Sequence, residues 1–187
     1  MFIQTEETPN PNSIKFYPGC EVAKSPMHFD SIENAKNIKL VKKLFMIEGV
    51  SAVFYGADFI TITKKADEDW TSLKTLVASA ILDQLTLGVQ PMEGFVEKLN
   101  SKIDDSNLSD IEKEIIEIIE TRVRPSVAMD GGDITFQKFE DGIVYLELKG
   151  SCSGCPSSTV TLKNGIESML QHYVPEVMAV EASNSEE

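Results

Sequence analysis

The chain has 187 residues, a formal net charge of −13, 42% hydrophobic residues and three cysteines. Its length predicts one or two domains that can each bury a core, and its apolar fraction excludes a disordered chain. No run approaches the roughly 20 apolar residues of a membrane span, and net acidity without a local basic patch disfavours binding to a phosphate backbone. We therefore expect a globular protein with neither a membrane nor a nucleic-acid partner.

The cysteine count narrows the class of protein further. Three cysteines cannot build a disulfide framework, and an odd number favours a reducing compartment in which thiols serve metal or redox chemistry. Residues 1–7 are acidic, lack arginine and hold no hydrophobic stretch, so they do not resemble a transit peptide.

The first half of the chain predicts a small α+β domain, assigned to residues 1–90. Stretches rich in β-branched and aromatic residues predict strands, and apolar residues at helical spacing predict helices. The predicted strands span 13–17, 50–55 and 58–63, and the predicted helices run from Leu40 up to Gly49 and over 70–87. Strands, a helix, a hairpin and a second helix in this order indicate α+β architecture.

A change in composition separates this domain from a second one. Residues 91–107 are rich in proline, glycine, asparagine and aspartate, which is typical of a flexible linker. A second small α+β domain is assigned to 108–182, followed by a solvated tail at 183–187. Residues 1–107 carry 11 basic and 15 acidic side chains, whereas 108–187 carry 6 and 15 and hold two of the three cysteines.

The second domain is predicted to begin with a capped helix. Ser109 precedes Glu112 at the spacing of a capping box, and isoleucines at helical spacing continue until Arg124-Pro125, where we expect the helix to weaken. Paired glycines predict a turn at Asp130-Gly131-Gly132-Asp133, whose aspartates we expect to cap the turn. The later elements are a hairpin of 134–139 and 143–148 around Asp141-Gly142, a helix from Ser157 to about Tyr173, and a closing strand at 177–180.

A C-x-x-C motif, Cys152 and Cys155, stands between this hairpin and the last helix. The separation of three residues brings both sulfurs to one end of a loop. Pro156 suits the first position of a helix, and the partial positive charge of a helix N-terminus lowers the pKa of nearby thiols. The motif therefore predicts a pair of thiolates that is ready for metal or redox chemistry.

Three functions compete for this pair. A thioredoxin-like dithiol oxidoreductase also places its cysteines between a strand and a helix, but the chain lacks the long β-α-β repeats of that fold. A structural zinc ion needs four ligands. The chain offers no second C-x-x-C, and His28 and His172 lie far from the pair in the sequence. Zinc would then have to bridge a dimer, and the protein would be an interaction module.

The third function follows from the same shortage of ligands. An iron–sulfur cluster of the 4Fe-4S or 2Fe-2S type is usually held by four thiolates, so two chains facing each other would supply them. A cluster at such an interface is labile, because separation of the subunits or attack by other thiols releases it. This suits a carrier that donates clusters.

Two parts of the sequence resemble a known family. Similarity to the C-terminal domain of NifU-type, or Nfu, iron–sulfur scaffold proteins lies in Arg122–Pro125, Met129–Asp133, Gly150–Ser158 and Thr161–Glu167. The opening, Phe2–Glu6 with Thr8-Pro9-Asn10-Pro11-Asn12 and Lys15-Phe16, resembles the N-terminal domain that accompanies it in the Nfu branch.

The resemblance implies a scaffold or carrier rather than an enzyme. Such a protein holds a cluster, usually 4Fe-4S, between the C-x-x-C pairs of two subunits and passes it to apo-proteins. The implied ligands are Cys152 and Cys155, and the cluster-loaded form would be a homodimer. The implied partners are apo iron–sulfur acceptor proteins and upstream cluster assembly factors. The chain lacks the cysteine-rich assembly domain of the longest NifU proteins, so we expect late delivery rather than primary assembly.

The opening resembles both bacterial and mitochondrial members of the family. Because no presequence precedes it, we expect the protein to be located in the bacterial cytoplasm. The alternative location is the mitochondrial matrix, where this sequence would be the mature form.

Other residues with chemical potential have simpler interpretations. We expect Cys20 to be an incidental small residue and His172 to lie on the surface near a helix end. Lys163 and Asn164 are interpreted as partner contacts or as solvated helix positions. The N-terminal domain has no evident site of its own, which suggests that it recognises partners.

Overall fold

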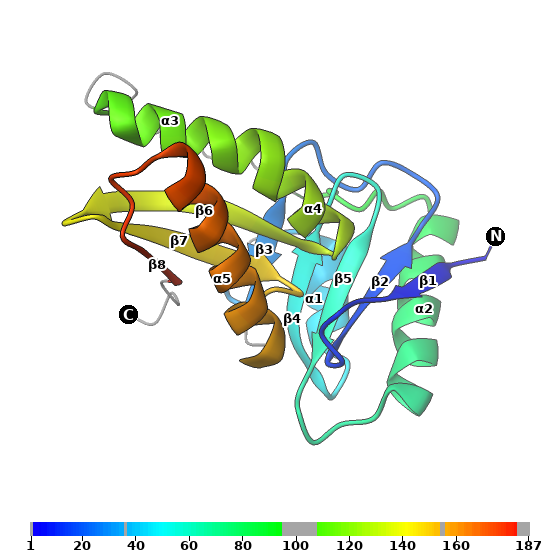
Figure 1. Ribbon diagram of the computed structural model, residues 1–187. Coiled ribbons are helices and arrows are strands. Elements are labelled where there is room, and N and C mark those ends of the chain that lie inside the picture. The colour runs from blue at the N-terminus through cyan, green and yellow to red at the C-terminus, as the bar shows by residue number, and fades with distance from the viewer. Residues whose placement is uncertain (1, 36, 95–107, 154–155, 183–187) are drawn as a thin grey trace. The chain divides into compact units, whose positions relative to one another are not determined.

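The structure, a computed structural model, describes residues 2–35, 37–94, 108–153 and 156–182. The chain divides into two compact units, 1–96 and 97–187, and each has its own cluster of buried apolar side chains. Both units combine helices with a sheet (Figure 1). The predicted class, two small α+β domains, is confirmed.

The first unit is built on a five-stranded antiparallel sheet with the order β1-β2-β5-β4-β3. The strands are β1 (Gln4–Glu7), β2 (Ser13–Tyr17), β3 (Met27–Phe29), β4 (Val50–Tyr55) and β5 (Ile60–Lys64). Side chains along a strand alternate between the two faces of a sheet. Ile14 and Phe16 of β2 and Ile60 and Ile62 of β5 therefore contribute to the same core.

Two helices, α1 (Lys39–Phe45) and α2 (Trp70–Thr86), complete this core. The carboxylate of Asp69 starts α2 by accepting a hydrogen bond from the backbone N–H of Thr71 at 3.1 Å. The inward faces of both helices belong to the same apolar cluster as the strands. Their buried residues are Leu40, Val41, Leu44, Leu73, Val77, Ala80 and Ile81.

Two strands of this sheet are absent from the sequence-based prediction. β1 has four residues, is polar and mostly exposed, and β3 has only three residues. Both are edge strands, which pair through backbone groups and show little of the apolar alternation by which a strand is recognised. The strand predicted at 58–63 begins instead at Ile60, because Gly56 donates its N–H to the carbonyl of Phe59 and closes the hairpin loop there.

The second unit contains a three-stranded sheet with the order β6-β7-β8. The strands are β6 (Gly132–Glu140), β7 (Ile143–Gly150) and β8 (Ala179–Ala182). β6 and β7 form the predicted hairpin, and Asp141 and Gly142 both have positive φ, as a type I′ turn requires. β8 pairs with β7 in parallel, so helix α5 (Pro156–Tyr173) is the crossover of a β-α-β unit (Figure 1).

The helix that opens the second unit changes its hydrogen-bond spacing before Arg124-Pro125 but does not end there. α3 (Asp110–Ile118) begins with the predicted capping box, passes through a π-helical turn (Ile119–Val123) and continues as α4 (Arg124–Met129). A proline ring clashes with the carbonyl four residues before it in an α-helix. The wider π-helical turn directly before Pro125 accommodates the ring by changing the hydrogen-bond spacing. The α-helical hydrogen bonding is thus interrupted next to Arg124-Pro125, in line with the prediction, and the helix nevertheless continues to Met129.

Part of the interval assigned to the linker is held by the first unit. The hydroxyl of Tyr55 donates to the carbonyl of Pro91 at 3.3 Å, and Lys39 forms an ion pair with Glu93 at 2.6 Å. Residues 95–107 and the tail at 183–187 lie outside the described residues. The linker and the domain limits therefore stay predictions.

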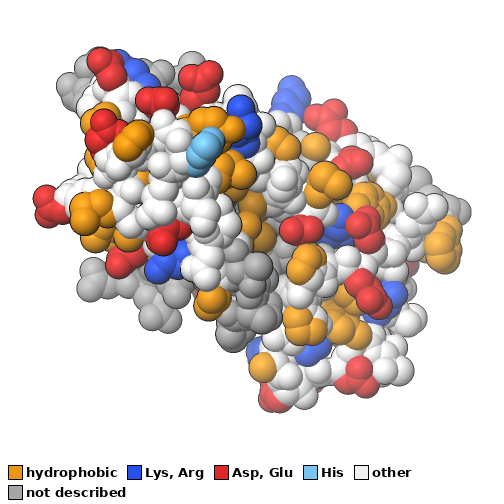
Figure 2. Space-filling view, viewed as in Figure 1, with side chains coloured by type: hydrophobic (Ala, Val, Ile, Leu, Met, Phe, Trp, Pro, Cys, Tyr) orange, Lys and Arg blue, Asp and Glu red, His pale blue; other side chains and the backbone are white. Residues whose placement is uncertain are grey.

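The surface shows acidic and basic side chains interspersed on the face drawn in Figure 2. Among the described residues, no helix has the length and apolar character needed to cross a bilayer.

Candidate metal centre

Cys152 lies in a turn between the end of β7 and the start of α5. Its side chain is packed into the core of the second unit, and the residue is only 5% exposed. This agrees with the predicted place of the motif between a strand and a helix. Cys155 lies outside the described residues. The turn occupies the carboxyl end of β7, the position at which parallel β-α units commonly bind ligands.

Gly132, the first residue of β6, makes room for the sulfur of Cys152. A Cβ atom placed on Gly132 would lie 2.9 Å from Sγ of Cys152 and 2.6 Å from the carbonyl oxygen of Lys149. Real side chains do not approach so closely, so only glycine fits beneath the sulfur. The second glycine of the predicted turn thus has a steric role toward the candidate ligand.

Ser151 joins the turn of Cys152 to the turn that precedes β6. Its backbone N–H donates to the carbonyl of Gly131 at 3.2 Å, and its hydroxyl donates to the carbonyl of Asp130. Ser153 donates its backbone N–H to the carbonyl of Gly150 at 3.1 Å and closes the Cys152 turn itself. The two turns, 21 residues apart in sequence, are therefore held side by side.

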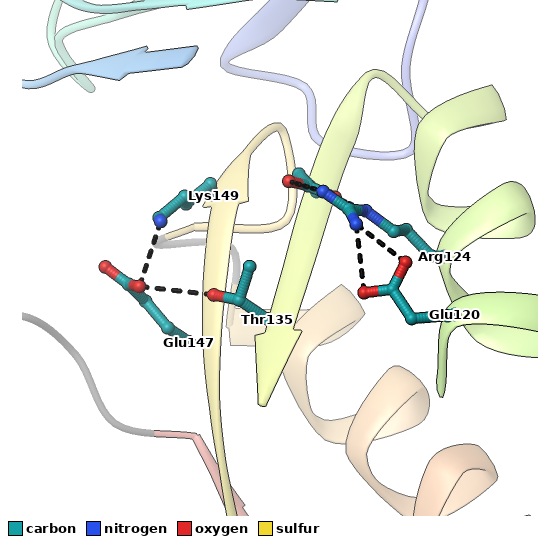
Figure 3. A network of polar contacts seen from close by, with 6 residues as sticks. Glu120, Arg124, Thr135, Glu147 and Lys149 are labelled. Atoms are coloured by element: carbon teal, nitrogen blue, oxygen red, sulfur yellow. Dashed lines mark hydrogen bonds and ion pairs between the residues drawn. The ribbon is translucent and has the colours of Figure 1, made fainter. Parts of the chain in front are cut away.

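An ion-pair network anchors the same end of β6 to the helix. Arg124 donates to both carboxylate oxygens of Asp133, from Nε at 2.7 Å and from Nη2 at 3.1 Å. It also reaches Glu120, four residues earlier, at 2.7 Å (Figure 3). Hydrogen bonds to Asp133, together with those to Glu120, raise the pKa of Arg124 despite its partial burial. The expectation that Asp133 caps the turn is wrong, because its carboxylate pairs with Arg124 instead.

A second set of polar contacts is centred on Glu147 of β7 and reaches across the hairpin to β6 (Figure 3). Glu147 accepts from the ammonium of Lys149 at 2.9 Å and from the hydroxyl of Thr135 at 3.2 Å. Lys149 stands opposite Asp133 in the strand register. Charged side chains of both signs therefore lie on the strands beside the Cys152 turn.

Other residues considered from the sequence lie elsewhere. Cys20 and His28 belong to the first unit, where burial raises the pKa of the Cys20 thiol. His172 lies near the end of α5, with its ring 4.9 Å from that of Tyr173. Lys163 lines a small apolar hollow between α5 and the sheet. Within the described ranges, no three His, Cys, Asp or Glu side chains gather in a way that could hold a metal ion.

Among the described residues of this turn, Cys152 offers a sulfur ligand of the kind that iron–sulfur clusters use. A thiolate is the usual ligand of such clusters, and Cys152 precedes Pro156, the first residue of the 18-residue helix α5, by four positions in the sequence. A cysteine thiol gives up its proton when it binds a metal, so the buried Cys152 thiol can supply such a thiolate on loading. Sequence reasoning identified the cysteines but missed the parts of Gly132, Ser151 and Arg124, which become visible only when the two turns come together.

Comparisons with known proteins agree with the resemblance in sequence. The family model described as "Scaffold protein Nfu/NifU N terminal" matches residues 3–88, and the model described as "NifU-like domain" matches residues 115–181. A solution NMR structure of a NifU-like protein from Saccharomyces cerevisiae covers 49% of this chain and 83% of its own, with 28% identity and a TM-score of 0.44.

Curated relatives extend over both units. The human protein named "NFU1 iron-sulfur cluster scaffold homolog, mitochondrial" is 48% identical over 185 residues, which cover 97% of this chain and 71% of the relative. The protein of the same name from Drosophila ananassae is 48% identical over 186 residues, which cover 97% of this chain and 64% of the relative. The chain thus spans about two thirds of the length of these relatives. It belongs to the Nfu family of iron–sulfur cluster scaffold homologues.

Proposed function

We propose that this chain is an iron–sulfur cluster carrier that holds a labile cluster between two copies and delivers it to apo-proteins. The observation that carries the proposal is the position of the Cys152 sulfur. It lies in the turn between β7 and α5, next to Gly132, which leaves room for it. The names of the relatives support a scaffold role. The cluster is the cargo of this protein, not a resident cofactor.

The number of ligands supports a shared cluster. One chain supplies Cys152 and Cys155, and a 4Fe-4S or 2Fe-2S cluster usually takes four thiolates. Two chains meeting at their C-x-x-C motifs would complete the set and form a homodimer on loading. The 4Fe-4S type is the one that the family resemblance favours.

Delivery requires no acid–base group of this chain. Thiolates of an acceptor can replace Cys152 and Cys155 one at a time, in the manner of thiol exchange. The partners are therefore apo iron–sulfur proteins that receive the cluster and assembly factors that supply it. On this proposal the protein is a carrier rather than an enzyme.

The cellular location is part of the proposal. The relatives carry the word mitochondrial in their names, which supports the mitochondrial matrix and lends no support to the bacterial cytoplasm that we expected first.

Anaerobic reconstitution with iron and sulfide tests this function. We expect the full chain to gain visible absorbance, to bind iron and sulfide, and to double its mass in solution. The variants Cys152→Ser and Cys155→Ser should lose the cluster, whereas the matched variant Cys20→Ser should load like the parent. A Cys152→Ser chain that holds as much cluster as the parent would show that the ligand assignment is wrong.

The same experiment separates the alternatives. A zinc-bridged interaction module would retain zinc on purification and show no visible absorbance after reconstitution. A dithiol oxidoreductase would reduce disulfides as a monomer without iron. Either result would replace the carrier function.

A further inference from the structure

Ser151 occupies a position that no requirement of cluster ligation explains. It directly precedes Cys152 and is only 2% exposed. Its hydroxyl donates to the carbonyl of Asp130, and its Oγ also lies 3.9 Å from Sγ of Cys152, within hydrogen-bond reach of a sulfur atom. The hydroxyl therefore stands between the candidate ligand and the turn that precedes β6.

A hydroxyl has a single proton to donate but two lone pairs that accept. Because the Ser151 hydroxyl donates its one proton to the Asp130 carbonyl, we assign the Cys152 thiol S–H as the donor in the contact between Sγ and Oγ. The two bonds form a short relay, from the Cys152 thiol through the Ser151 hydroxyl to the Asp130 carbonyl.

Metal binding removes the first donor of this relay. A cysteine that binds iron does so as a thiolate, and its proton leaves to solvent. The sulfur is then an acceptor only. The Ser151 hydroxyl can keep a favourable contact with it by rotating about its Cα–Cβ bond and donating to sulfur, and in doing so it releases the Asp130 carbonyl.

We propose that Ser151 is a positioning residue of the cluster site whose hydroxyl changes partner on loading. In the metal-free chain the hydroxyl ties the Cys152 turn to Asp130, and in the loaded chain it donates to the Cys152 sulfur. After this rotation the bond from the Ser151 N–H to the Gly131 carbonyl continues to join the two turns. The second half of this proposal rests on the proposed function, and the first half does not.

The first test uses the metal-free full chain. Ser151→Ala removes the hydroxyl, and the matched variant Ser153→Ala removes a hydroxyl two residues away in the same turn. We expect amide hydrogen exchange in segments 129–133 and 150–153 to become about fivefold faster in Ser151→Ala, which corresponds to the loss of one hydrogen bond. Ser153→Ala should exchange like the parent. Equal exchange in both variants would overturn the tie to Asp130.

The second test uses chains reconstituted anaerobically with iron and sulfide. Resonance Raman spectra in H2O and D2O report hydrogen bonds to a cysteine sulfur, because deuteration shifts the Fe–S(Cys) bands. We expect the shift in the parent and in Ser151→Thr, which keeps the hydroxyl, and its loss in Ser151→Ala. The midpoint potential of Ser151→Ala should become more negative, since hydrogen bonds to cluster sulfurs influence that potential. Transfer to a chelator should become about fivefold faster.

The outcomes distinguish the change of hydrogen-bond partner at Ser151 from the carrier function. A parent chain that loads normally, with Raman bands and potential unchanged in Ser151→Ala, would overturn the change of partner and leave the carrier function standing. A parent chain that takes up no iron and sulfide would overturn the carrier function, while the exchange experiment still decides the tie to Asp130. Circular dichroism of every metal-free variant verifies that each is folded.

Discussion

Arg124 and Asp133 form a two-point ion pair that fastens the first strand of the candidate site to the preceding helix. Nε and Nη2 of Arg124 each donate a hydrogen bond to the carboxylate of Asp133, whose side chain is only 5% exposed. Paired, parallel hydrogen bonds of this kind combine charge with geometry. Gly132, which leaves room for the Cys152 sulfur, lies next to Asp133. The ion pair therefore also fixes the position of the backbone that contacts this sulfur.

Loss of this pair is expected to destabilise the second unit. Arg124→Leu would leave the buried Asp133 carboxylate without this partner, a change that costs about 3 kcal/mol when one member of a buried pair is removed. The matched variant is Lys138→Leu, which breaks the exposed pair of Lys138 with Glu140 on the same hairpin and should change the stability much less, because solvent screens exposed charges.

Urea unfolding followed by far-UV circular dichroism measures both losses. The single tryptophan, Trp70, belongs to the first unit, so its fluorescence serves as an internal control that should not change. Equal losses in Arg124→Leu and Lys138→Leu would contradict the special role of the buried pair.

Gly132 offers a steric prediction. In Gly132→Ala the new Cβ would press on the Lys149 carbonyl and on the Cys152 sulfur, and overpacking of this kind costs about 1–3 kcal/mol. We expect lower stability and fewer iron atoms bound per chain after reconstitution. Gly165→Ala, on α5, is the matched control. Its Cβ would meet nothing within 4 Å, and alanine should stabilise the helix by about 0.5–1 kcal/mol. A Gly132→Ala chain that is as stable as Gly165→Ala and binds as much iron would contradict the steric role of Gly132 beside the Cys152 sulfur.

The capping box of α3 predicts a dependence on pH. Glu112 accepts from the Ser109 hydroxyl at 2.7 Å and from its backbone N–H at 2.8 Å, and these bonds hold the pKa of Glu112 below its ordinary value of 4.5. A carboxylate whose pKa is lowered by folding stabilises the folded state fully at a pH above its ordinary pKa. This stabilisation is lost as the pH falls from the ordinary pKa through the lowered one. Glu112→Gln does not titrate, so the stability difference between parent and variant should shrink as the pH falls from 6 to 3. A constant difference in urea unfolding over this range would show that the carboxylate charge contributes nothing.

Local signals were sufficient for most elements of the fold. Each of these signals predicts structure from residues that are close together in the sequence. Examples are the Ser109–Glu112 spacing, the Asp141-Gly142 turn and the periodic apolar residues of the helices. The edge strands β1 and β3 escaped prediction because their pairing depends on backbone groups of distant neighbours. The helix through Pro125 escaped because a change to π-helical spacing leaves no mark in the pattern of apolar residues.

The candidate site was predictable only in part, for a related reason. Cys152 was identified from its spacing to Cys155, a relation within the sequence. The contacts of Ser151 with Asp130 and of Gly132 with the Cys152 sulfur join segments about 20 residues apart. They arise because the β6–β7 hairpin folds back and brings its two ends together, which no local pattern encodes.

The separation of the two cores predicts that the cluster chemistry belongs to the second unit alone. The buried side chains of that unit form one cluster that includes Cys152, and the first unit has a cluster of its own. A fragment of residues 108–187 should therefore fold and bind iron and sulfide at the same ratio per chain as the full protein. A fragment of residues 1–96 should fold and bind none, although it contains Cys20. The Cys152→Ser form of the first fragment serves as its negative control. Iron and sulfide analysis with circular dichroism measures both properties, and a folded 108–187 fragment that fails to load would show that the first unit contributes directly to the cluster site.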